Sequence, residues 1–249
     1  MANTFRRTEN KYLLEPDQWR PMLTLLRENM QSDAFDDGDG YNVCNIYYDN
    51  ANNTLIRASV SKPLYKEKLR VRSYGVPDDG SKVYVEVKKK TKGVVSKRRI
   101  SMRLRDVEPF LICGVIPPDL TEASLQIAKE LLYMQSIYRA VPKLYLAYRR
   151  FAFTGIEDER LRVTIDVDIL TRRDDLKLES GIYGESLIGD KAIMEVKFIG
   201  QKPIWLTRAM YALGIRKTSF SKYGTEYAAF RRAQMEDHSV KEPTGDGDA

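Results

Sequence analysis

The sequence has few of the residues that build several common phosphate, metal and redox sites. Its only histidine, His238, lies in a polar C-terminal stretch, which disfavours a phosphohistidine intermediate and a histidine-rich metal site. The two cysteines, Cys44 and Cys113, have no metal-ligand spacing and suggest no disulfide framework. A reducing, cytoplasmic location fits this cysteine content best.

Signals for membrane insertion and for nucleotide-binding loops are also missing. No run of about 18 uncharged apolar residues occurs, so no membrane-spanning helix is predicted. Residues 1–7 lead into charged positions rather than an apolar core, so we expect no secretory signal. A P-loop is disfavoured because the pattern G-x-x-x-x-G-K-S/T is missing. No linker interrupts the chain, which predicts one domain over residues 1–235 and a disordered polar tail over residues 236–249.

The stretch from Lys66 to Arg72 carries a cation at every second position. Because side chains alternate along a β-strand, its four cations would share one face, with Leu69 and Val71 on the other. Four like charges on one face are unfavourable unless water or an anion lies opposite them. The apolar alternates indicate which face packs on the core.

Other segments repeat this alternation of charged and apolar positions. A turn at residues 75–80 predicts antiparallel pairing of residues 66–72 with residues 82–90. Strands are predicted at residues 7–14, 43–48, 66–72, 82–90, 94–105, 144–153, 161–170 and 192–199. Amphipathic helices are predicted at residues 16–30, 122–139, 203–213 and 221–235.

The charged faces can be interpreted in two ways. Antiparallel sheets often turn a charged face to water, and any one of these strands fits that explanation. Taken together, however, the faces consist mostly of long basic side chains with a few isolated acids, and they contain little Thr, Ser or Gln. We therefore expect an α+β fold, mainly antiparallel β, closed into a barrel whose charged faces point inward and whose helices pack outside.

The interior of such a barrel would be a basic tunnel with a few carboxylates. Arg forks and Lys point charges hold multiply charged oxyanions, and carboxylates hold a divalent cation. Phosphoryl transfer needs mainly this positioning and charge neutralisation. Nucleic acid is a less fitting polyanion, because most aromatic residues fall on the apolar faces rather than on the basic ones.

The chain carries an ordered series of short motifs, which are Glu9-Asn10-Lys11-Tyr12, Lys68-Leu69-Arg70-Val71-Arg72, Glu86-Val87-Lys88, Tyr148-Arg149-Arg150-Phe151-Ala152-Phe153, Arg162-Val163-Thr164-Ile165-Asp166, Glu195-Val196-Lys197 and Ser221-Lys222-Tyr223. In this ordered series the chain resembles the triphosphate tunnel metalloenzymes, and among them the catalytic domain of the vacuolar transporter chaperone (VTC) polyphosphate polymerases. The resemblance extends from about Arg7 to Ala229 and implies an eight-stranded closed tunnel.

The resemblance also implies roles for individual residues. ATP, inorganic polyphosphate, tripolyphosphate or pyrophosphate would occupy the tunnel, and Mn²⁺ or Mg²⁺ would be bound by Glu195 and Glu9. The residues expected to act on the transferred phosphate are Lys11, Arg70, Arg72, Lys88, Arg150 and Arg162. Further substrate contacts are expected from Lys68, Lys97, Tyr148, Lys197, Ser221 and Lys222.

One departure from the family pattern bears on the reaction. Hydrolases of the CYTH branch carry E-x-E-x-K in the first strand, whereas this chain has Arg7 at the first glutamate position, before Glu9 and Lys11. An arginine there should weaken a second metal and water activation, which favours transfer to a phosphate acceptor. The implied function is an ATP-dependent polyphosphate polymerase. The alternatives are a tripolyphosphate or nucleoside triphosphate hydrolase and a non-catalytic polyphosphate-binding module.

The eukaryotic complexes of this family join the domain to a membrane part and a regulatory SPX domain. This chain carries no membrane segment of its own, so we expect any membrane partner to be a separate protein.

Overall fold

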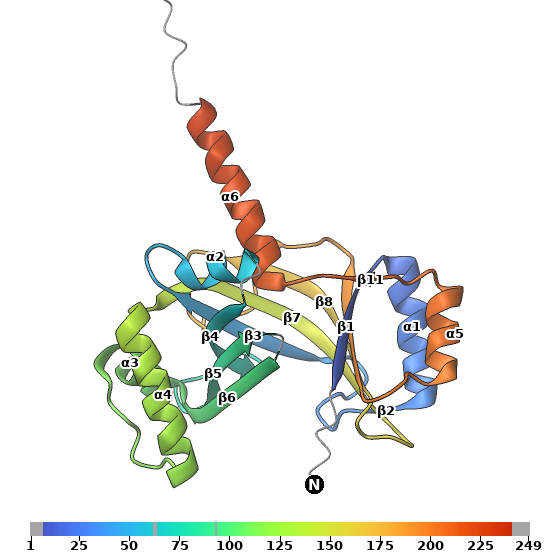
Figure 1. Ribbon diagram of the computed structural model, residues 1–249, viewed down its shortest axis with the longest axis horizontal. Helices are drawn as coiled ribbons and strands as arrows, with labels where there is room; N and C mark the ends of the chain where they lie inside the picture. The colour runs from blue at the N-terminus through green and yellow to red at the C-terminus, as the bar shows by residue number, and fades with distance from the viewer. Residues whose placement is uncertain (1–6, 62–63, 93, 241–249) are drawn as a thin grey trace, which may run out of the picture.

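The computed structural model describes residues 7–61, 64–92 and 94–240 of the chain. Its fold is α+β: a curved sheet with helices on both of its faces (Figure 1). The strands are β1 (Thr8–Leu14), β2 (Met30–Ser32), β3 (Tyr41–Asp49), β4 (Tyr65–Tyr74), β5 (Lys82–Thr91), β6 (Val94–Arg103), β7 (Val141–Gly155), β8 (Arg162–Arg172), β9 (Glu185–Ser186), β10 (Ala192–Phe198) and β11 (Lys217–Thr218). The helices are α1 (Pro16–Asn29), α2 (Thr54–Val60), α3 (Leu104–Cys113), α4 (Glu122–Tyr138), α5 (Ile204–Ala212) and α6 (Lys222–Val240).

The sheet follows one hydrogen-bonded path in the order β11-β1-β10-β8-β7-β3-β4-β5-β6, and every pairing in it is antiparallel. Short strands extend it, with β2 on β7 and β9 on β8. Within the described ranges, no pairing joins β6 to β1 or β11. The mainly antiparallel α+β fold is therefore confirmed, whereas the closure of eight strands into a barrel is not.

The sheet has two arms, one formed by β4, β5 and β6 and the other by β1, β10 and β8. Each arm has an apolar outer face, as the alternation predicts. On β4 and β5, Leu69, Val71, Val83, Val85 and Val87 are buried and pack in one core with side chains of α3 and α4. β1, β8 and β10 bury their alternate apolar residues in a second core with α1 and α5. Figure 1 shows α3 and α4 beside one arm and α1 and α5 beside the other.

The opposite, concave face is covered at one end by α2 and α6 (Figure 1). A third apolar cluster forms there and includes Ile56 of α2, Leu146 of β7, Ile193 of β10 and Tyr223 of α6. The carboxylate of Asp49 begins α2 by accepting hydrogen bonds from the backbone amides of Leu55 and Ile56, at 2.9 and 2.8 Å. These helices leave only part of the concave face free for polar side chains.

Several element boundaries differ from the sequence prediction. The strand predicted to reach residue 105 ends at Arg103, where α3 begins. α6 continues through the predicted boundary at residue 235 to Val240 and contains His238, while residues 241–249 of the expected tail lie outside the described residues. In the part of the chain that the structure covers, no helix is long and apolar enough to cross a membrane.

A bulge in β8 changes which residues face the concave side. Ala147 pairs with Leu170 and Arg149 with Val167, so β8 has one more residue than β7 across this interval. Asp168 takes up the extra length at φ +51°, a conformation that Asp tolerates better than most residues. Its exposed carboxylate pairs with Arg149, whereas an uninterrupted alternation through the strand predicted at residues 161–170 would place it on the same face as Asp166.

A candidate anion-binding site on the concave face

Cations from seven strands and from the start of α6 meet on the free part of the concave face, here called the basic cleft. The strand registers place them in rows, because residues paired across an antiparallel sheet point to the same side. The residues of the basic cleft are Lys11, Tyr47, Lys68, Arg70, Arg72, Glu86, Lys88, Lys97, Tyr148, Arg150, Arg162, Asp166, Glu195, Lys197, Ser221 and Lys222.

One row consists of three lysines on three neighbouring strands. Lys68 of β4 lies opposite Lys88 of β5, which lies opposite Lys97 of β6. Like charges directly opposite each other in a sheet destabilise it. In the described residues, no carboxylate forms an ion pair with Lys68 or Lys88, and Lys68 donates only to the Ser221 hydroxyl, at 3.0 Å. An anion bound on the concave side would relieve the repulsion within this row.

The next row contains one carboxylate that serves two cations. Arg70 donates to Glu86 Oε2 through Nε at 2.8 Å and Nη2 at 2.6 Å, and Lys97 Nζ lies 2.7 Å from Oε1. Glu86 is almost fully buried, which acts against ionisation, but Arg70, Arg72 and Lys97 lower the pKa of its carboxyl to about 2. The strand register and this ion pair place Lys97 on the concave face together with Arg99, which pairs with Glu86, whereas Arg98 lies on the opposite face.

Arg72 is the most deeply buried cation of the cleft, with 6% of its surface exposed. It donates to the side-chain oxygen of Asn45 at 2.9 Å and to the Tyr148 hydroxyl at 3.2 Å. Both partners are neutral, and in the described part of the chain no carboxylate forms an ion pair with Arg72. A buried guanidinium surrounded by neutral acceptors favours an incoming anion.

The start of α6 connects two distant strands of the sheet. Arg150 donates to Asp166 through Nε at 2.6 Å and Nη2 at 2.8 Å, and Lys222 Nζ lies 2.5 Å from the same carboxylate. Asp166 is fully buried, yet Arg150 and Lys222 outweigh its burial and keep its pKa below the usual range. Since Ser221 contacts Lys68 on β4, the two residues at the start of α6 connect β4 with β8 across the concave face.

The carboxylates expected to bind a metal lie together on β1 and β10. Lys11 Nζ is 2.9 Å from Glu195 and 3.8 Å from Glu9, and Lys197 Nζ is 3.2 Å from Glu195. Although burial disfavours its charge, Lys11, Lys197 and Lys222 keep the pKa of Glu195 well below the usual range. Mg²⁺ is commonly bound by one or two carboxylates together with substrate phosphates. Glu195 with Glu9 fits that arrangement, and the described residues contain no group of three or more potential metal-ligating side chains.

Two further basic residues lie at the rim of the cleft, of which Arg162 is an expected site residue and Lys66 is not. Arg162 shares a row with Lys197, is exposed, and forms no ion pair with a described carboxylate. Lys66 lies further along β4 and donates to the backbone oxygen of Ser59 at 3.3 Å.

Tyr47 is a cleft residue that the sequence reading did not identify. Its hydroxyl accepts a hydrogen bond from Arg70 at 3.3 Å, and its ring lies 4.7 Å from that of Tyr223. Burial acts to raise the pKa of Tyr47, but Arg70, Lys68 and Arg72 reverse this and lower it to about 8. Its strand is buried on both faces, so only the pairing of Tyr47 with Arg70 across β3 and β4 reveals the contact.

The cleft contains one small cavity among its side chains. A cavity of only about 30 Å³ lies among Tyr47, Lys68, Arg70, Glu86 and Lys88. That is roughly the volume of one water molecule. A bound phosphate would therefore replace Glu86, Glu195 or Asp166 as the partner of some cations.

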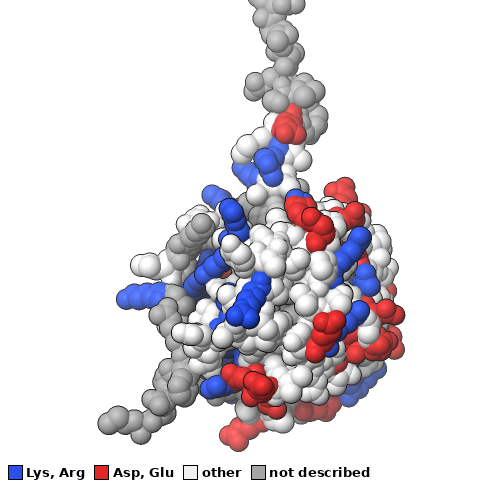
Figure 2. Space-filling view, turned by 90° about the vertical axis from the view of Figure 1, so that its right-hand side faces the viewer, with Lys and Arg blue, Asp and Glu red and all other residues white. Residues whose placement is uncertain are grey.

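The face over α1 and α5 carries both signs of charge and forms no single basic patch (Figure 2).

A curved antiparallel sheet gathers cations around a few buried carboxylates on its concave face, which makes this face a candidate site for multiply charged oxyanions. The family model described as the VTC domain matches residues 6–231, and the chain belongs to this family. No curated protein sequence matches the chain.

Two solved structures resemble the fold at low sequence identity. A putative adenylyl cyclase from Hippeastrum, whose structural report describes a dominant triphosphatase activity, has 16% identity and a TM-score of 0.50, over 92% of this chain and 96% of that one. A putative adenylate cyclase from Bacillus halodurans has 12% identity and a TM-score of 0.49, over 86% of this chain and 92% of that one.

Proposed function

We propose that this protein is a metal-dependent polyphosphate polymerase, which transfers the γ-phosphate of ATP to the end of a polyphosphate chain in the basic cleft. The observation that carries the proposal is the row of Lys68, Lys88 and Lys97 beside Arg70 and Arg72. Five cations on three adjacent strands suit a chain of phosphates better than a single one. Membership of the VTC domain family supports the same substrate class.

In the proposed reaction, a terminal oxygen of the acceptor attacks the γ-phosphorus of ATP. A new P–O bond forms to the acceptor while the bond to the β-phosphate oxygen breaks, and ADP leaves with that oxygen. Such transfer depends mainly on in-line positioning and on neutralising the charge of the transferred group. Arg70, Arg150 and Lys222 would supply this neutralisation, and Arg72 and Lys88 would hold the acceptor chain.

A divalent cation fits this proposal at Glu195, with Glu9 as a second ligand. When bound, the cation would neutralise part of the negative charge on the substrate phosphates. Lys11 and Lys197 now neutralise Glu195, and we expect both to turn to the phosphates when substrate binds. Mn²⁺ and Mg²⁺ both suit a site made of carboxylate and phosphate oxygens.

Hydrolysis of tripolyphosphate or of a nucleoside triphosphate is the second candidate. It is a candidate because the structural report on the Hippeastrum protein, which has a similar fold, describes a dominant triphosphatase activity. Arg7 argues against it, because this exposed cation stands next to β1 where the hydrolases carry a carboxylate. A basic residue there does not activate water.

The test is to incubate the full chain with ATP and Mn²⁺ and to resolve the products by chain length on a gel. Long-chain polyphosphate with a matching amount of ADP supports the polymerase. ADP and orthophosphate alone would refute it and favour the hydrolase. Tight polyphosphate binding without turnover, with Mn²⁺ and with Mg²⁺, would instead identify a non-catalytic binding module. A cytoplasmic location and a separate membrane partner remain predictions.

A further inference from the structure

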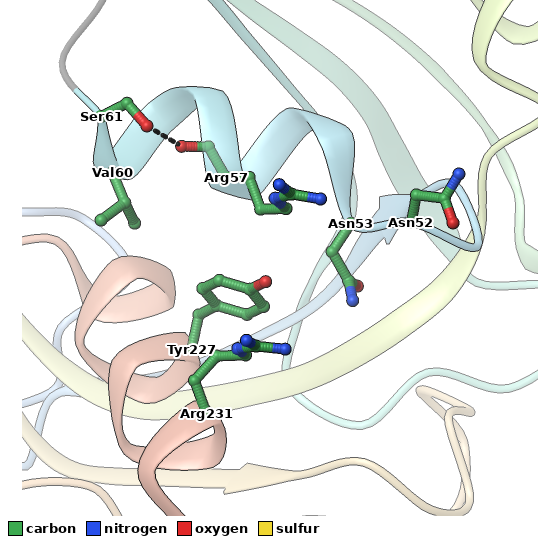
Figure 3. Close-up of a pocket in the computed structure, with 7 residues that line it drawn as sticks. All are labelled: Asn52, Asn53, Arg57, Val60, Ser61, Tyr227 and Arg231. Atoms are coloured by element: carbon green, nitrogen blue, oxygen red, sulfur yellow. Dashed lines mark hydrogen bonds between the residues drawn. The ribbon is translucent and has the colours of Figure 1, made fainter. Parts of the chain in front are cut away.

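A second polar cavity lies outside the basic cleft, between α2 and α6. It has a volume of about 480 Å³, at the lower end of the roughly 300–1,000 Å³ typical of small-molecule sites. Its walls come from the start and end of α2 and from one side of α6 (Figure 3). The lining residues are Asn52, Asn53, Arg57, Val60, Ser61, Tyr227 and Arg231, and none of them belongs to the basic cleft.

The charge of this cavity comes from two arginines on opposite walls. Arg57 extends from α2 and Arg231 from α6 (Figure 3). In the part of the chain that the structure describes, neither arginine forms an ion pair with a carboxylate. Two carboxylates of neighbouring segments accept hydrogen bonds from other groups. Asp49 accepts the first amides of α2, and Glu226 accepts a bidentate pair of hydrogen bonds from Arg173, both at 2.7 Å.

One buried polar atom without a partner, an acceptor oxygen, lies beside the arginines. The side-chain oxygen of Asn53 is buried and has no hydrogen-bond partner, and Asn53 itself is held at φ +55° where α2 begins. Tyr227 is largely buried and forms a wall of the cavity between the two arginines (Figure 3). The Ser61 hydroxyl donates to the backbone oxygen of Arg57 at 2.9 Å, which ties the end of α2 together.

We propose that the cavity between α2 and α6 is a second oligophosphate site, which takes a free anion of pyrophosphate to tripolyphosphate size between Arg57 and Arg231. Guanidinium groups match phosphate oxygens in bidentate pairs, and two of them on opposite walls suit an anion with at least two phosphate groups. The volume leaves room for such an anion. The site stands whether or not the basic cleft transfers phosphate, because the two share no residue.

The position of this site on α6 ties it to the basic cleft. Arg231 and Tyr227 lie on the same helix that begins with Lys222, whose ammonium contacts Asp166 at 2.5 Å. An anion held between α2 and α6 therefore contacts the helix that delivers one cation to the cleft.

The test is isothermal titration of the full chain with inorganic tripolyphosphate in four backgrounds. These are the unchanged protein, Arg57→Gln with Arg231→Gln, Lys68→Met with Lys88→Met, and all four substitutions together. We expect two sites in the unchanged protein, and the arginine pair should remove one site whether or not the lysines are present. The charge-conserving double variant Arg57→Lys with Arg231→Lys should keep the site but bind tripolyphosphate at least about tenfold more weakly, because lysine lacks the bidentate hydrogen bonding of a guanidinium group.

Two results would overturn the proposal. One is an arginine double variant that keeps the stoichiometry and affinity of the unchanged protein. The other is a lysine double variant that binds no tripolyphosphate. Circular dichroism shows whether each variant is folded, and the lysine-for-arginine pair serves as the test if the glutamine pair is not.

Discussion

Arg150 and Asp166 face each other on neighbouring strands of the basic cleft and share two hydrogen bonds, of 2.6 and 2.8 Å. The pair fixes the plane of the guanidinium, and Asp166 is also the partner of Lys222. Asp166 is therefore a positioning residue for two cations that we propose to contact phosphate. The position of these cations depends on a residue that is itself fully buried.

Replacing Asp166 by Ala should destabilise the protein by about 3–5 kcal/mol, because two cations lose a buried partner. Asp166→Asn keeps the shape and one acceptor, so its destabilisation should be smaller. Both changes are measured by chemical unfolding. Asp168→Asn is the matched control, since that carboxylate is exposed and its ion pair with Arg149 lies at the surface. Equal destabilisation by Asp166→Ala and Asp168→Asn would show that the buried pair has no special role.

Glu195→Gln should abolish metal-dependent turnover of ATP while leaving the protein folded. The amide keeps the size of the side chain but removes the charge that a divalent cation needs. We expect at least a hundredfold loss of rate and a small change in melting temperature. Glu185→Gln on the exposed strand β9 is the control and should have normal activity. Normal turnover in Glu195→Gln would disprove the metal assignment.

Lys88→Met should affect stability and binding in opposite directions. Removing one of three opposed lysines relieves repulsion of about 0.2–1 kcal/mol, which corresponds to a rise in melting temperature of about 1–3 °C without ligand. The same change removes a charge-assisted contact worth about 1.5–3 kcal/mol, so tripolyphosphate should bind to the cleft roughly ten- to a hundredfold more weakly. Lys129→Met on the exposed side of α4 is the control and should change neither quantity. Unchanged affinity in Lys88→Met would exclude this row from binding.

Binding of oligophosphate should weaken as the pH rises through 8. Burial together with Lys11 and Lys88 lowers the pKa of Lys68 to about 8, and Tyr47 also has a pKa of about 8. Above that pH Lys68 loses a positive charge and Tyr47 gains a negative one, and both changes repel an anion. Each lost proton can reduce affinity by up to about tenfold per pH unit.

Titration of the protein from pH 7 to pH 9 checks this expectation. Tyr47→Phe should remove part of the pH dependence, together with a tyrosinate absorbance that develops near pH 8 in the unchanged protein. An affinity that stays constant from pH 7 to pH 9 would contradict the assignment of Tyr47 and Lys68 to the site.

The sequence predicts the arms of the sheet well because their chemical contrast is strong. Charged and valine positions alternate through β4 and β5, and only one face of such a strand can be buried. The cations on the concave face follow from this alternation. Whether the sheet closes cannot be predicted from this alternation, because the pairing of the first and last strands depends on the curvature of the whole sheet. The open path between β6 and β11 therefore appears only in three dimensions.

The residues that sequence reasoning missed depend on contacts between distant segments. Asp168 interrupts the alternation through a single backbone angle, and Tyr47 becomes a cleft residue through its pairing with Arg70. The short helix α2 starts because Asp49 accepts its first amides, a cap that lies outside the usual N-cap position. None of these three features has a repeating pattern in the sequence.

The position of β6 at the end of the sheet gives its basic residues an additional task. Val94 and Val95 are exposed there, and an unpaired strand edge with exposed valines can pair with the edge of another molecule. Lys97, Arg98 and Arg99 follow directly, and cations on an edge strand oppose such pairing. We therefore expect the strand that we propose to offer charge to a phosphate chain also to oppose pairing between copies of this protein, so that removing its charges together promotes aggregation as well as weakening binding.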